Sequence, residues 1–209
     1  GYDTEAQTAA GIGPFSYTII DTTAADPAFS AGLEIKAGYV QARVEPVAGI
    51  ALDAGVRYED ATQEVVPLGL DGLPSGSANA TLLNNDYWLP AATLTWEIAD
   101  SLQARFNASK TIARPQFREL ILQTYYDPES NRQFTGNPGL VDSELTNYEA
   151  RVEYYWGSGS KFSLAGFYKD IENPIEVFSS FNDNTVVSRF ANAPQAELYG
   201  AEVEVQWNK

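Results

Sequence analysis

Polarity in the middle of this chain alternates from one residue to the next, and this alternation limits the folds available to it. Between residues 102 and 112, apolar side chains occupy every second position, with Lys110 as the exception. Residues 148–156 repeat the pattern, and after a glycine- and serine-rich turn it resumes in residues 161–171. Successive side chains of a β-strand point to opposite faces, so each segment is a strand with one apolar and one polar face. A helical spacing of apolar residues fits less well.

Further segments show strand character, and the connections between them alternate in length. The predicted strands cover residues 33–44, 50–59, 87–98, 102–113, 148–156, 161–171 and 198–207. Long loops are expected at 60–86, 114–147 and 172–197, and residues 1–32 form a loop-rich N-terminal segment. Pro90 lies near the start of one strand, where it costs a ladder hydrogen bond. The sequence therefore predicts an all-β, antiparallel up-and-down meander.

Two architectures give a sheet one apolar and one polar face. A soluble sandwich buries the apolar face against a second sheet, whereas a membrane barrel turns it towards lipid and keeps the polar face in a wet lumen. Short turns alternating with long loops, and aromatic residues near strand ends, are typical of outer-membrane barrels. These residues are Tyr58, Trp88, Trp96, Tyr148, Trp156, Phe162 and Trp207. We therefore favour part of a transmembrane β-barrel, with a soluble, glycan-binding β-sandwich as the alternative.

Composition excludes several classes of function. The 209 residues carry a formal net charge of −15, which leaves no basic surface for nucleic acid. Histidine and cysteine are absent, so Ser–His–Asp or Cys–His catalysis and disulfides are impossible. We predict no enzyme activity, no cofactor and no metal site. An outer-membrane hydrolase barrel would need catalytic residues outside this segment.

Several short motifs, taken in order along the chain, resemble the barrels of TonB-dependent outer-membrane receptors. The first is Ser109-Lys110-Thr111-Ile112-Ala113-Arg114-Pro115-Gln116-Phe117-Arg118-Glu119-Leu120. It is followed by Gly136-Asn137-Pro138, Asn147-Tyr148-Glu149, Phe167-Tyr168-Lys169-Asp170-Ile171 and Gly200-Ala201-Glu202-Val203-Glu204. The resemblance covers residues 33–209 and is nearest to the large receptors of sphingomonad- and Caulobacter-like bacteria.

The resemblance implies a barrel of about 22 strands, an N-terminal plug and a TonB-type inner-membrane energy transducer that pulls on the plug. On this interpretation the chain supplies about seven strands without the plug, and other strands must cover its two sheet edges. The resemblance also implies contact with the outer-membrane lipid of a Gram-negative bacterium. The expected function is energy-coupled import of an iron–siderophore complex or an oligosaccharide.

The predicted loop 114–147 contains the best candidates for substrate binding. Aromatic rings flanked by arginine, glutamine and asparagine suit a sugar face or an aromatic siderophore. The alternative is an aromatic-rich loop that packs on its neighbours. The candidates are Tyr125, Tyr126, Asp127, Arg132, Gln133, Phe134 and Asn137. On the polar faces of two strands, Arg105, Glu149, Arg151 and Glu153 are expected to face the lumen as a cross-strand charge ladder.

Overall fold

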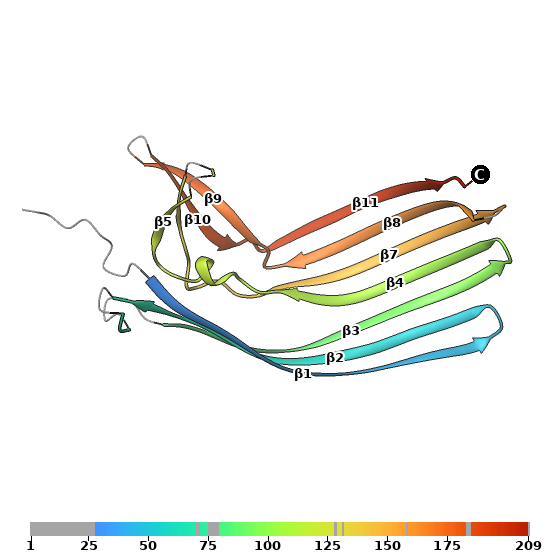
Figure 1. The fold of residues 1–209 in the computed structure, drawn as a ribbon, viewed down its shortest axis with the longest axis horizontal. Helices are drawn as coiled ribbons and strands as arrows, with labels where there is room; N and C mark the ends of the chain where they lie inside the picture. Colours follow the sequence, from blue (N-terminus) through green and yellow to red (C-terminus); the bar gives the residue numbers. More distant parts are fainter. Residues whose placement is uncertain are drawn as a thin grey trace, which may run out of the picture.

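Seven long strands form one antiparallel sheet in the computed structural model of the chain, which describes residues 28–69, 72–74, 80–127, 129–130, 132–157, 159–182 and 185–208. In their order across the sheet they are β1 (Ala28–Val47), β2 (Ile50–Leu68), β3 (Thr81–Ala99), β4 (Leu102–Ala113), β7 (Ser143–Trp156), β8 (Ser160–Glu172) and β11 (Gln195–Gln206). Figure 1 shows the short connections at one end of the sheet and the long insertions at the other, here called the loop end. The predicted antiparallel meander is confirmed.

The two faces of the sheet differ in polarity and exposure, as the alternation predicts. On β7, Tyr148 and Val152 are 53 % and 44 % exposed, whereas Glu153, which points to the other face, is 4 % exposed. Trp88 and Trp96 of β3 share the apolar face and are also exposed. A β-sandwich would bury these side chains, and no described element covers them. The sandwich alternative is therefore wrong, and the apolar face suits contact with lipid.

Aromatic side chains border the apolar face in two rows. Nearer the loop end, the rings of Tyr58 and Trp88 lie 4.9 Å apart. Near the short turns, the rings of Trp156 and Trp207 lie 6.1 Å apart. Along β7, the distance from Tyr148 to Trp156 is roughly 26 Å at ~3.3 Å per residue. A strand tilt of ~40° reduces this to about 20 Å of height, which is close to the ~25 Å apolar band of outer-membrane barrels.

The strands extend further towards the loop end than the sequence predicts. β1 begins before residue 33, β2 continues past residue 59, and β3 begins before residue 87, so more than half of the predicted loop 60–86 is strand. Ala61, Gln63 and Val65 continue the alternation of β2 and are buried on its polar face. An insertion from elsewhere in the chain covers these residues. The pattern of residues along one strand does not indicate such a covering segment. Residues 1–27, most of the predicted N-terminal segment, lie outside the described residues.

β3 and β4 separate halfway along their length. Their pairing stops at Ala91 and Ser109, so residues 81–90 of β3 pair with β2 alone. Pro90 stands at this point, and its nitrogen has no hydrogen to donate to a ladder. Figure 1 shows the two strands diverging towards the loop end. Pro90 is thus not a minor irregularity at the start of β3 but lies at its centre, where pairing with β4 ends.

Two insertions that are distant in sequence combine into a smaller sheet at the loop end (Figure 1). The first contains the 3₁₀ helix η1 (Phe117–Glu119), β5 (Thr124–Asp127) and β6 (Arg132–Thr135); the second contains β9 (Ile175–Asn182) and β10 (Thr185–Asn192). β6 pairs in parallel with β10, which gives the order β5-β6-β10-β9. Residues 115–142 and 173–194 are called the loop module below. Among the described residues, no helix has the length and apolarity needed to cross a membrane.

The main buried apolar cluster lies where the loop module meets the sheet. Leu120, Ile121, Leu140 and Phe190 of the module are buried together with Val65 of β2. Each fully buried aliphatic or aromatic side chain of this kind contributes about 1.5–3 kcal/mol. This burial fixes the loop module on the polar face of β2. It also explains why that face, which is otherwise polar, carries the apolar Val65 near the loop end.

Candidate functional site

Tyr125 and Phe134 face the core of the loop module. They are cross-strand neighbours on β5 and β6, and their rings stack with centroids 5.8 Å apart. Phe134 also stacks on Phe190 at 5.8 Å, and the Arg118 guanidinium carbon lies 4.9 Å from the centre of the Tyr125 ring. Burial raises the pKa of the Tyr125 hydroxyl. Of the two alternatives left open for this loop, packing on its neighbours describes these two rings, because the alternation of β5 and β6 turns them inward; a role of either residue in substrate binding stays a prediction.

The opposite face and the tip of the β5–β6 hairpin are open. Tyr126 is 58 % exposed, and Arg132 and Gln133 are also exposed. The carboxylate of Asp127 accepts the Ser130 hydroxyl at 2.6 Å and the Ser130 backbone N–H at 3.3 Å. The hydroxyl bond is the main reason why the pKa of Asp127 is lowered. Asp127 thus orders the turn, while Tyr126, Arg132 and Gln133 offer accessible side chains to a ligand.

Asn137 and the preceding Gly136 have structural contacts. The Asn137 amide donates to the carbonyl oxygen of Phe190 at 3.1 Å, and its Oδ1 accepts a backbone N–H two residues further on at 2.9 Å. A Cβ at Gly136 would collide with the carbonyl oxygens of Ile121 and Arg118. These contacts join the two insertions, which explains why glycine and asparagine occupy this motif.

Polar contacts link the loop module to β2 and β3, on one side of the gap between β3 and β4. The Tyr87 hydroxyl and the Asn85 amide, both on β3, donate to Oδ2 of the buried Asp142 at 2.9 and 3.1 Å. On β2, the Nε2 of Gln63 donates to the carbonyl oxygen of Pro115 at 2.7 Å. Since Pro115 follows β4 and Asp142 precedes β7, side-chain hydrogen bonds replace the missing backbone ladder.

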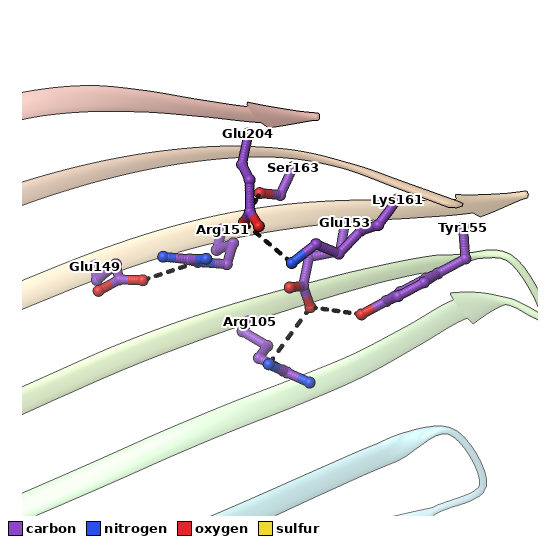
Figure 2. Close-up of polar contacts among 8 residues, drawn as sticks. All are labelled: Arg105, Glu149, Arg151, Glu153, Tyr155, Lys161, Ser163 and Glu204. Carbon is purple, nitrogen blue, oxygen red and sulfur yellow. Dashed lines mark hydrogen bonds and ion pairs between the residues drawn. The ribbon is translucent and has the colours of Figure 1, made fainter. Parts of the chain in front are cut away.

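A polar cluster lies on the polar face near the short turns, as Figure 2 shows. Arg105 of β4 lies 3.4 Å from Glu153 of β7, which also accepts the Tyr155 hydroxyl at 3.2 Å. Arg151 pairs with Glu149 along β7 at 3.2 Å. Arg105 and Arg151 are direct cross-strand partners. Each turns to a different glutamate, so the two positive charges do not oppose each other. The four predicted residues come together, and their facing a lumen stays a prediction.

The cluster continues onto two further strands through residues that the sequence analysis did not select. The Lys161 ammonium of β8 lies 3.0 Å from Glu204 of β11, which also accepts the Ser163 hydroxyl at 3.3 Å (Figure 2). The sequence does indicate the face on which they lie, because all three residues occupy the polar positions in the alternation of their strands. Only the register between strands shows that they meet the first four.

Positive charge is distributed unevenly between the large sheet and the loop module. Eight lysine or arginine side chains form ion pairs, and all lie on the strands of the large sheet or directly after β4. Within the described residues, four cations form no ion pair: Arg118, Arg132, Lys169 and Arg189. Three of these four belong to the loop module, which therefore offers uncompensated arginines to an anion. Among all residues that the structure describes, no group of three or more acidic side chains is placed to hold a metal ion.

The sheet, with one exposed apolar face, short turns at one end and long insertions at the other, is part of an outer-membrane type of β-barrel wall. The sequence matches the "TonB dependent receptor-like, beta-barrel" family over residues 1–208. The chain belongs to this family and supplies part of the barrel, as its motifs indicated. The family consists of outer-membrane transport receptors and not of enzymes. The sphingomonad- and Caulobacter-like subgroup stays a prediction.

Solved structures of receptors share this fold. The Serratia marcescens hemophore receptor HasR, solved with its hemophore HasA and heme, has a TM-score of 0.63 at 14 % identity, covering 88 % of this chain and 33 % of that one. The ferric-catecholate import receptor Fiu of Escherichia coli K12 has a TM-score of 0.58 at 16 % identity, covering 85 % of this chain and 26 % of that one. The alcaligin outer-membrane receptor FauA of Bordetella pertussis has a TM-score of 0.56 at 19 % identity, covering 86 % of this chain and 28 % of that one. The chain thus spans about a third or less of these receptors. No curated protein matches the sequence.

Proposed function

We propose that the receptor containing this chain imports a negatively charged iron chelate across the outer membrane of a Gram-negative bacterium. A TonB-type inner-membrane partner would supply the energy through the receptor's plug. The names of the similar structures support iron as the cargo, since they refer to heme, a ferric catecholate and alcaligin. The observation that carries the choice of an anion is the set of unpaired arginines in the loop module, in a chain of net charge −15. A guanidinium presents five donors to oxygen anions.

Import of an oligosaccharide, the other class expected from the sequence, has less support. Sugar faces stack on exposed aromatic rings. Of the three aromatic rings on β5 and β6, those of Tyr125 and Phe134 are turned into the module core, which leaves Tyr126.

Equilibrium binding to the purified full-length receptor tests this proposal, with ferric catecholate, ferric citrate, heme and a maltooligosaccharide as probes. Replacing Arg118, Arg132 and Arg189 together by glutamine should weaken binding of the anionic chelates at least tenfold, or about 1.4 kcal/mol. The matched control replaces Lys36 and Arg43, which already have carboxylate partners, and should leave affinity unchanged. Binding of the maltooligosaccharide alone would exclude an iron chelate as the substrate.

A further inference from the structure

A hollow of about 520 Å³ lies between the loop module and the polar face of β1 and β2. It is separate from the polar cluster of Figure 2, which lies near the short turns. Its walls are largely apolar and include two phenyl rings. The lining side chains used below are Phe29, Leu33, Gln63, Pro115, Phe117 and Arg118. A hollow of this volume accommodates a ring-sized part of a small ligand.

Gln63 lines this hollow and carries an unsatisfied hydrogen-bond acceptor. The residue is only 3 % exposed, and its Oε1 has no hydrogen-bond partner. The orientation of the amide is determined by its Nε2, which donates to the carbonyl oxygen of Pro115 at 2.7 Å. A buried carbonyl oxygen without a donor is unfavourable, so a ligand that brings an O–H or N–H to this oxygen is favoured.

Arg118 contributes a positive charge to the same hollow. Its guanidinium forms no ion pair and lies 4.9 Å from the centre of the Tyr125 ring, an arrangement that restricts its position. The other cation in the lining, Arg114, forms an ion pair with Glu59 at 2.9 Å, a carboxylate that it shares with Arg57. The hollow therefore combines apolar walls, one unsatisfied acceptor and one arginine that forms no ion pair.

We infer that this hollow binds one aromatic ring of the imported chelate, a ring that carries a hydroxyl or amide donor beside an anionic oxygen. The ring would pack against Phe29 and Phe117, its donor would bond to Gln63 Oε1, and Arg118 would pair with its anionic oxygen. This inference rests on the proposed function and narrows it, because an aliphatic chelate of equal charge lacks the ring and the donor. Phenolate chelates that carry an amide N–H beside the ring meet the requirement.

The test compares two anionic iron complexes on the full-length receptor: the ferric complex of N-(2,3-dihydroxybenzoyl)glycine, which has the ring, an amide N–H and a free carboxylate, and ferric citrate, which has no ring and no amide. The wild type should prefer the aromatic complex, and this preference should fall about tenfold in Gln63→Met, which removes the acceptor, together with the Nε2 donor to Pro115, but no charge. Arg118→Gln should reduce it to a similar extent. Phe178→Leu, on an exposed edge strand outside the hollow, is the control and should keep the wild-type preference.

The possible results separate the subsite from the proposed function. A wild type that binds both complexes equally, or a preference unchanged in Gln63→Met and Arg118→Gln, overturns the aromatic subsite while iron-chelate import stands. A wild type that binds neither complex nor heme overturns the proposed function. If Gln63→Met does not assemble in the membrane, Phe117→Leu replaces it, since it keeps an apolar side chain and should also lower the preference.

Discussion

The large sheet and the loop module use the same alternation of polarity in opposite ways. In the sheet, apolar side chains such as Val152 point away from the protein, and polar ones such as Glu153 are covered. In the loop module, Phe134 and Phe190 point into a core, while Tyr126 and Gln133 face outwards. The medium around each sheet explains the difference, because lipid accepts an apolar surface and water does not. Alternation therefore identifies a strand without identifying which face is covered.

The largest expected effect comes from placing a charge on the apolar face of the sheet. Val152→Arg should destabilise the full-length receptor in lipid vesicles by roughly 2–4 kcal/mol, because the guanidinium would enter the hydrocarbon region. Gln41→Arg, on the exposed polar face of β1, is the control and should change stability little. Urea-induced unfolding measures both. Equal losses in the two variants would mean that the faces are assigned wrongly.

A smaller and more local effect is expected inside the loop module. The Cβ of Gly136→Ala would overlap backbone carbonyl oxygens, and overpacking of this kind costs about 1–3 kcal/mol. Hydrogen exchange should accelerate in β5 and β6 while the large sheet remains protected. Gly38→Ala is the matched control, since a Cβ there meets no atom within 4 Å. Loss of protection across the whole sheet would show that module and wall unfold together.

Removal of one hydrogen bond between the two regions should have a still smaller effect. Tyr87→Phe deletes the hydroxyl that donates to buried Asp142, and we expect a loss of about 1–2 kcal/mol. Tyr39→Phe, with a side chain 73 % exposed, should be neutral. Thermal unfolding of the receptor distinguishes them, and a neutral Tyr87→Phe would remove this contact from the anchors of the module.

The smallest effect is a dependence of the β5–β6 tip on pH. Because the folded pKa of Asp127 is lowered, its contribution is complete above the ordinary value of 3.8 and disappears as pH falls through the lowered folded value. Exchange of the Ser130 amide, expressed relative to the intrinsic exchange rate at each pH, should therefore be constant between about pH 7 and 5 and rise only below that ordinary value. Asp127→Asn should abolish this rise; if the rise persists in that variant, another group controls the tip.

The sequence was sufficient for the seven strands and the faces of β7, because each is a local pattern. It was insufficient for the ends of β2, since Gln63 and Val65 are strand residues only under the cover of the loop module. Parallel pairing of β6 with β10 joins segments that lie more than 50 residues apart, and no local signal reports it. The residue pattern locates the loop that contains Tyr125 and Tyr126, but it does not indicate which ring points inward. Gln63 was not selected because it falls within a predicted loop.

The separation of β3 from β4 at Pro90 affects how receptors of this kind should be dissected. Excision of an external loop is a usual way to ask what the loop recognises, on the assumption that the wall closes without it. Here Asp142 bonds to β3 and Pro115 bonds to β2, across the gap where β3 and β4 share no backbone ladder beyond Ala91. Excising residues 115–142 would leave an open seam in the wall, so lost uptake in such a deletion would report leakage or misassembly as readily as lost recognition. Point substitutions on the module surface avoid this confusion.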